Sequence, residues 1–165
     1  MFLTNLDYEL LVSSMNKEIR SINGNIVIKE QQNVKQEMAY PFATYSINNP
    51  YLNTKTYGSS TDEITQSIEV VLSYTFYSQN SFECMSLAQK ALSNFKQRGT
   101  LQNLWEHGIS VIDVSNIQNR DTFITVDVER RVGFDVRTRV KVVSNKEMRD
   151  IIDVVLQDGT TIEKN

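Results

Sequence analysis

The clearest alternation of hydrophobic and polar residues lies within residues 118–143. From Ile124 onward, apolar residues occupy most even positions and charged or polar residues occupy most odd positions. Because side chains of a strand point alternately to its two faces, this pattern predicts a long half-buried strand or a closely joined pair of strands. Three positions break the two rows, namely Arg130, Thr138 and Gly133.

Two other segments have a helical period. Residues 4–23 can form a helix capped by Thr4 and stopped at Asn23-Gly24, with Asp7 at the third position of a weak capping box. A second helix is predicted between Asn80 and Gly99. The apolar stripes expected on the two helices are Leu6, Leu10, Met15, Ile19 and Ile22, and then Phe82, Met85, Ala88, Leu92 and Phe95.

Shorter segments rich in β-branched and aromatic residues predict further strands. They are residues 25–29, 40–47, 64–77, 109–114 and 149–156. Strands gathered around two helices and joined by short turns favour an α+β domain. We therefore expect one domain over residues 1–165, with a mainly antiparallel sheet flanked by two main helices.

Residues 48–62 are predicted to form a long loop, because Asn-Pro and Gly-Ser-Ser interrupt a stretch without apolar period. Loops of this length inside a compact domain are uncommon and often carry function. Tyr51, Leu52 and Tyr57 are apolar enough to anchor on a partner. A flexible surface loop is the alternative interpretation.

Length and charge narrow the classes of function. The 165 residues are 40% hydrophobic, which suits one compact core. The net charge of −3 lacks the basic excess typical of proteins that grip DNA by its phosphates. No apolar run is long enough to span a membrane, and we expect no export signal, so the protein is expected to be made in a cytoplasm.

Candidates for catalysis are few. His107 is the sole histidine and Cys84 the sole cysteine, which cannot supply a standard zinc site. A small hydrolase using His107 with Asp113 or Asp121 is the alternative to a structural role, but a histidine before a glycine more often caps or packs. Cys84, beside the apolar stripe of the second helix, is interpreted as a buried structural thiol. We expect the protein to have no enzymatic activity and to bind no cofactor or metal ion.

The charged row of the long strand pattern carries both signs. Asp127 and Glu129 share that row with Arg131, Arg137 and Arg139, so a ladder of ion pairs is favoured over a metal or hydrolase set. Mixed signs suit contact between protein surfaces better than contact with a polyanion.

Two residues of this segment have more specific expectations. Arg130 sits at an inward position, so it must lie at a bulge or reach a buried carboxylate. Gly133 indicates a bulge or a close approach of two backbones.

Several runs together resemble the neck or tail terminator proteins of tailed bacteriophages, over roughly residues 42–140. These runs are QSIEVVLSYTFYS, LAQKALSNF, GISVIDVSNIQNRDTF and VDVERRVGFDVRTRV. The most distinctive part is Asn119-Arg120, then Glu129-Arg130-Arg131, then Gly133-Phe134-Asp135-Val136.

The resemblance implies a virion protein, assembled in the host cytoplasm, that forms a homo-oligomeric ring, usually of six subunits. The ring would cap the tail tube protein, stop tube polymerisation and meet the head connector or adaptor protein, as well as the sheath protein if the tail is contractile. DNA would pass through its lumen without specific binding. The same resemblance implies structural or inter-subunit roles, but no catalytic role, for Arg120, Glu129, Arg130, Arg131, Gly133, Asp135, Arg137 and Arg139. A head-completion or adaptor protein of the connector is the main alternative.

Overall fold

The computed structural model describes most of the chain. The described residues are 2–3, 6–33, 38–58, 63–122, 129–145, 153–155 and 161–163. The helices are α1 (Tyr8–Ile22), α2 (Ser81–Asn94) and α3 (Arg98–Glu106), with a short 3-10 turn η1 (Gln31–Asn33). The strands are β1 (Phe2–Leu3), β2 (Val27–Glu30), β3 (Phe42–Gly58), β4 (Glu63–Ser78), β5 (Ile109–Val114), β6 (Gln118–Asn119), β7 (Arg130–Asn145), β8 (Asp153–Val155) and β9 (Thr161–Glu163).

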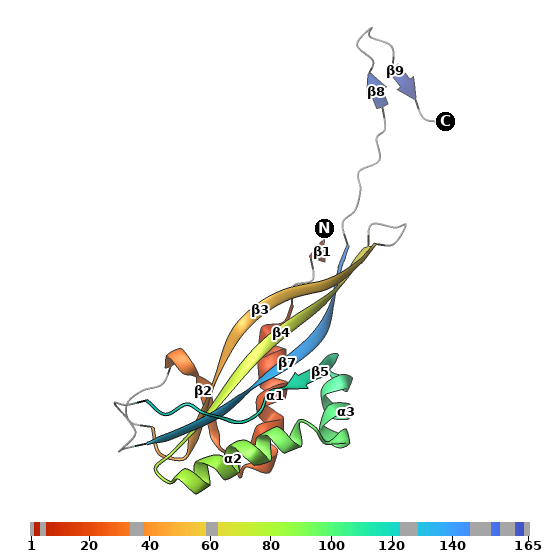
Figure 1. Ribbon diagram of the computed structural model, residues 1–165. Helices are drawn as coiled ribbons and strands as arrows, with labels where there is room; N and C mark the ends of the chain where they lie inside the picture. Colours follow the sequence, from red (N-terminus) through yellow and green to blue (C-terminus); the bar gives the residue numbers. More distant parts are fainter. Residues whose placement is uncertain are drawn as a thin grey trace.

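A seven-stranded sheet organises the described chain, with three long central strands in the order β7, β4, β3 (Figure 1). These strands pair antiparallel, whereas β2 pairs parallel with the start of β3. The other edge of β7 is shared by β1, β5 and β6, each at a different height. The expected α+β class with a mainly antiparallel sheet is therefore confirmed.

The helices cover one face of this sheet. Even-numbered side chains are buried beneath them from Ile68 onward in β4 and from Val132 to Val142 in β7, and Tyr74 and Phe134 are fully buried. The hydroxyl of Tyr74 donates to Oδ1 of Asn16 on α1 at 3.1 Å, so this buried polar group is satisfied. Thr138 is the polar residue that interrupts the apolar row of β7. Its buried hydroxyl also has a partner, since it donates to the Val70 carbonyl at 3.0 Å. The period-two pattern thus predicted the core face of both strands.

Helix α1 begins later than the sequence pattern predicts. Thr4 lies outside the described residues, and the N-cap is Asp7, whose carboxylate accepts the N–H of Leu10 at 2.9 Å. The predicted stop is confirmed, because Asn23 is the C-cap and Gly24 follows with a φ of +62°, in the left-handed region that glycine tolerates. Leu11 is buried in place of the predicted Leu10.

The stripe predicted for α2 is partly wrong. Asn80 caps the helix as expected, but Phe82 and Met85 are 82% and 49% exposed. The buried side is formed instead by Cys84, Ala88, Ala91 and Phe95. Small side chains let the helix lie close to the sheet, which a stripe of large residues would prevent. The helix also ends at Asn94, and the predicted stop Gly99 lies inside α3.

The predicted loop at 48–62 is wrong for its first eleven positions, since residues 48–58 form the outer half of β3. Residues 59–62 lie outside the described part. Register shifts after Ile47, Asn49 and Asn53 break the alternation, and Pro50 removes one donor. Side chains here are exposed on both faces, so neither apolar period nor composition identifies a strand.

Strand β7 supplies most of the long predicted strand, and Gln118–Asn119 pairs back on it as β6. The part of the pattern from Ile124 to Val128 lies outside the described residues. Of the predicted C-terminal strand at 149–156, residues 153–155 form β8, which pairs with β9 in a separate two-stranded sheet.

Candidate interaction surface

The sheet face opposite the helices, here called the open face, carries the odd-numbered residues of β4 and β7. Cross-strand partners share a face, and the register therefore places Ser73, Thr75 and Tyr77 beside Asp135, Gly133 and Arg131. Seven of the eight motif positions named above lie on this face or in the segments that border it, and Arg130 lies in the even-numbered row at the start of β7.

The outer part of the open face contains an ion-pair set centred on Glu69. Its carboxylate lies 2.6 Å from Nη2 of Arg139 and 3.9 Å from Nε of Arg137. The Glu69 side chain is buried, while those of Arg137 and Arg139 are 53% and 44% exposed. The predicted ladder is thus present in part: Glu129 pairs with Arg131 as expected, whereas the acid beside Arg137 and Arg139 comes from β4. Asp127 lies outside the described residues.

Arg120, in the segment after β6, connects β4 and β7 at the middle of the open face. Its guanidinium donates to Oγ of Ser73 at 2.7 Å and Oγ1 of Thr75 at 2.8 Å, and it pairs with Asp135 at 2.9 Å. This reach passes over Gly133, where a Cβ would collide with the Tyr74 carbonyl oxygen and lie 2.7 Å from Nη1 of Arg120. Of the two expectations for Gly133, close approach is the one observed, since the β4–β7 register has no shift there.

Glu129 and Arg131 belong to a closed set of contacts at the inner end of the open face. Nε of Arg131 donates to Glu129 at 2.7 Å, and the Arg131 guanidinium lies over the Tyr77 ring at 5.3 Å. Tyr77 stacks on Phe42 at 4.6 Å, and Phe42 contacts Tyr40. The Tyr40 hydroxyl donates to Glu129 at 2.5 Å, and this hydrogen bond raises the pKa of Tyr40 to about 12.

Arg130 is expected either to lie at a bulge or to reach a buried carboxylate, and the second arrangement is observed. Its Nη1 lies 3.3 Å from Oδ2 of Asp121, whose side chain is only 16% exposed. Burial alone would raise the pKa of Asp121, but the backbone N–H of Arg131 and the Arg130 guanidinium outweigh it and hold the pKa below its usual value. These contacts therefore favour the ionised form of Asp121, which pairs with Arg130.

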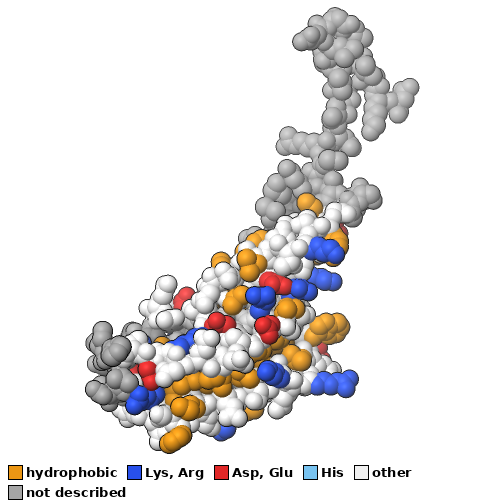
Figure 2. All heavy atoms as spheres, viewed as in Figure 1, with side chains coloured by type: hydrophobic (Ala, Val, Ile, Leu, Met, Phe, Trp, Pro, Cys, Tyr) orange, Lys and Arg blue, Asp and Glu red, His pale blue; other side chains and the backbone are white. Residues whose placement is uncertain are grey.

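The outer part of the sheet, here called the arm, comprises residues 48–58, 63–71 and 137–145 and continues past the helices (Figure 1). Tyr51, Leu52 and Tyr57 are 46%, 41% and 51% exposed on it. Figure 2 shows Lys and Arg side chains gathered along this part of the molecule, with hydrophobic side chains between them. The three residues predicted to meet a partner therefore lie on a strand, accessible from outside.

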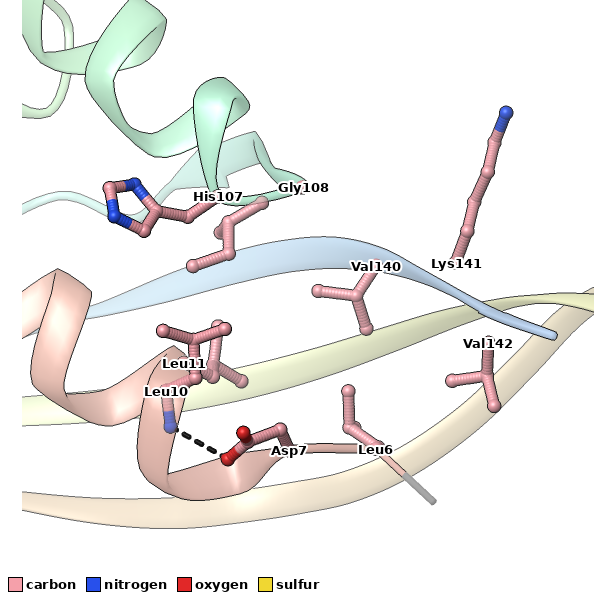
Figure 3. A pocket seen from close by; sticks show the side chains of 10 residues that line it. Leu6, Asp7, Leu10, Leu11, His107, Gly108, Val140, Lys141 and Val142 are labelled. Atoms are coloured by element: carbon pink, nitrogen blue, oxygen red, sulfur yellow. Dashed lines mark hydrogen bonds between the residues drawn. The ribbon is translucent and has the colours of Figure 1, made fainter. Parts of the chain in front are cut away.

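His107 is not arranged for catalysis with either predicted acid. Its Nδ1 lies 2.9 Å from the carbonyl of Asn103, at the end of α3. Asp113 accepts the N–H of Val114, and Asp121 is held by Arg130. His107 does line an open pocket of about 220 Å³, where Figure 3 shows it and Asp7 on opposite sides of an apolar floor.

Other chemistry has little support within the described residues. Cys84 is buried, its thiol donates to the Phe76 carbonyl, and burial raises its pKa to about 11, in agreement with a structural thiol. No group of three His, Cys, Asp or Glu side chains in the described part is placed to hold a metal ion. Among the described helices none is long and apolar enough to cross a membrane.

Sequence reasoning missed two residues of this surface. Glu69 gave a weak signal, as the sole acid in the outward row of residues 64–77. Tyr40 gave none, since its partner Glu129 lies 89 positions away in the chain.

Fold and surface together define an α+β protein whose distinctive side chains form an ion-paired sheet face and an exposed strand arm. A model of the family described as phage neck terminator protein matches residues 13–165. The chain therefore belongs to the phage neck terminator protein family and is a structural component of the phage neck. No curated protein matches it.

Proposed function

We propose that this chain forms a closed homo-oligomeric ring, of six subunits, on the last ring of the tail tube. The ring stops further addition of tube subunits and offers its other side to the head connector or adaptor protein. In a contractile tail it also meets the end of the sheath. DNA passes through the lumen without specific binding.

Membership in the neck terminator family carries this proposal. The open face supports it, because Arg137 and Arg139 keep about half of their side-chain surface exposed although both contact Glu69. A ring needs two different, complementary patches on each subunit, and a surface of mixed sign can supply them. The net charge of −3 suits a channel in which DNA slides without adhering.

Deletion of the gene tests the proposal. Without a terminator, tubes continue to polymerise, so electron micrographs should show tails of irregular, excessive length that are not joined to heads. Tails of normal length beside filled heads that leak DNA would indicate a head-completion protein and would overturn the proposal. Location of the chain in the intact particle, and its subunit number, follow from a reconstruction of the neck.

A further inference from the structure

The open face of the arm is basic. The register aligns Lys55 of β3 with Ser67 of β4 and Lys141 of β7, and the next row contains Glu69 and Arg139. Arg137 follows one row further along β7. Glu69 and, at the tip, Glu63 are the acids at these registers, so four cations face two carboxylates in a chain whose net charge is −3.

Apolar side chains lie between these cations. Leu52 is opposite Glu69, and Tyr57 is opposite Thr65, which in turn is opposite Val143. Leu52, Tyr57 and Val143 are 41%, 51% and 38% exposed, respectively. The ammonium of Lys55 lies 5.0 Å from the centroid of the Tyr57 ring. A partner for this face therefore needs both carboxylates and apolar side chains.

The C-terminal segment of the same chain has the matching composition. Residues 150–163 contain four acids and no Lys or Arg, together with six Ile, Val and Leu residues. Strands β8 and β9 lie within this segment and pair only with each other in the described structure. The segment is thus acidic and apolar where the arm is basic and apolar.

The β8–β9 hairpin also needs a partner for its own stability. An isolated two-stranded hairpin is at best marginally stable in water. The register places Asp153 opposite Glu163, and like charges at directly opposed positions destabilise a strand pair. Cations from another surface would remove this cost.

We propose that the β8–β9 hairpin of one copy docks on the open face of the arm of a neighbouring copy. This inference rests on the proposed ring. Each subunit then gives one hairpin and receives one, which is the head-to-tail arrangement that closes a ring. Acids of the hairpin meet Lys55 and Lys141, and its Ile and Val residues cover Leu52, Tyr57 and Val143. Double-stranded DNA is a poorer occupant, because Glu69 lies among the cations and DNA offers little apolar surface.

Charge reversal in the full-length chain tests the docking. An arm variant carries Lys55→Glu and Lys141→Glu, and a hairpin variant carries Asp153→Lys and Glu163→Lys. Each reversal places like charges across the interface, so each variant alone should assemble at least about tenfold more weakly in analytical ultracentrifugation. A matched control, Lys90→Glu with Lys96→Glu on and after α2, reverses two exposed lysines away from the arm and should assemble as the wild type does.

Mixing the two variants separates docking between copies from docking within one chain. In an equimolar mixture every negative arm finds a positive hairpin on a different copy, so assembly should return. If only a single chain that carries all four changes recovers, the hairpin docks on its own arm and the proposal is overturned. Unchanged assembly of both single variants also overturns it, as does a wild type that stays monomeric at every concentration tested.

Nucleic acid is tested with a short fluorescent DNA duplex in the same buffers. Duplex binding that the arm variant loses, together with unchanged assembly, would assign the arm face to DNA and overturn hairpin docking. The ring itself is judged separately in phage particles. A ring that is present in the neck of particles built from either single variant would leave the proposed function standing while the docking failed.

Discussion

The guanidinium of Arg120 lies directly over Gly133, so the absence of a side chain at residue 133 is what lets Arg120 reach β4. A Cβ on Gly133 would stand 2.7 Å from Nη1 of Arg120 and collide with the Tyr74 carbonyl oxygen. Arg120 in turn holds Ser73, Thr75 and Asp135. One glycine therefore permits a contact that joins β4, β7 and the segment after β6.

Gly133→Ala should lower the free energy of unfolding by about 2–3 kcal/mol, the upper range for overpacking, because backbone cannot move aside as a flexible side chain can. Denaturant titration measures the change. Gly99→Ala is the matched control, since nothing lies within 4 Å of its Cβ position and alanine favours the helix α3. The control should be neutral or more stable than the wild type by up to about 1 kcal/mol. Equal stability of Gly133→Ala and wild type would contradict the close approach.

Tyr40→Phe should make unfolding less sensitive to alkaline pH. The folded chain raises the pKa of Tyr40 from 10.0 to about 12, mainly through its hydrogen bond to Glu129. The folded state thus holds this proton more tightly, and the resulting stabilisation is complete below pH 10 and is lost as pH rises from 10 to about 12. The variant should be about 1 kcal/mol less stable near neutral pH, the value of one hydrogen bond.

Thermal unfolding between pH 8 and 12 measures this dependence. Glu129→Gln removes the carboxylate that accepts this hydrogen bond and raises the pKa of Tyr40, so it should also flatten the profile. Burial raises the pKa of Tyr74 as well, and its share of the alkaline loss should persist in both variants. An unchanged profile in Tyr40→Phe would mean that the closed set of contacts around Glu129 does not form.

The sequence predicted the inner sheet well and the arm poorly, for a physical reason. Tyr74 and Phe134 alternate with polar residues because one side of their strands is packed on helices and the other is not. On the arm that difference between faces disappears, and the register shifts of β3 also break the period. The pattern of apolar and polar residues therefore predicts a loop at residues 48–58, where the structure has a strand.

The interaction surface was predictable in kind and less so in detail. Alternation placed Arg137 and Arg139 on one face, but only the register between β4 and β7 identifies Glu69 as their shared partner. Similarly, the helix period could not decide between Phe82 and Cys84 as the inward residue, because the sheet's shape selects the smaller one. Residue type defines which contacts are possible, and tertiary pairing selects among them.

His107→Ala should leave phage assembly and infectivity unchanged. The imidazole is exposed and its described contact is with the Asn103 carbonyl, so the loss of stability should stay within about 0.5 kcal/mol. Complementation of a phage that lacks the gene measures function, and circular dichroism confirms folding. A folded variant that assembles normally but yields non-infectious particles would support the alternative of a hydrolase that uses His107.

Reversal of Arg137 and Arg139 to Glu should impair ring assembly more than it impairs the fold. Exposed ion pairs contribute only about 0–1 kcal/mol each, and the half-exposed arginines fall near that range. Because Glu69 is buried and would lose both partners, we expect the free energy of unfolding to fall by about 2 kcal/mol. Assembly, in contrast, depends on the exposed charge itself and should weaken by about tenfold or more.

A compensated variant separates the two effects. Adding Glu69→Lys to the two reversals restores opposite charges within the subunit, and stability should recover in denaturant titration. The outward charge stays reversed, so ring assembly, measured by ultracentrifugation, should remain weak. If stability and assembly recover together, Arg137 and Arg139 act through the fold of the arm, and the open face at this position is not an interface between subunits.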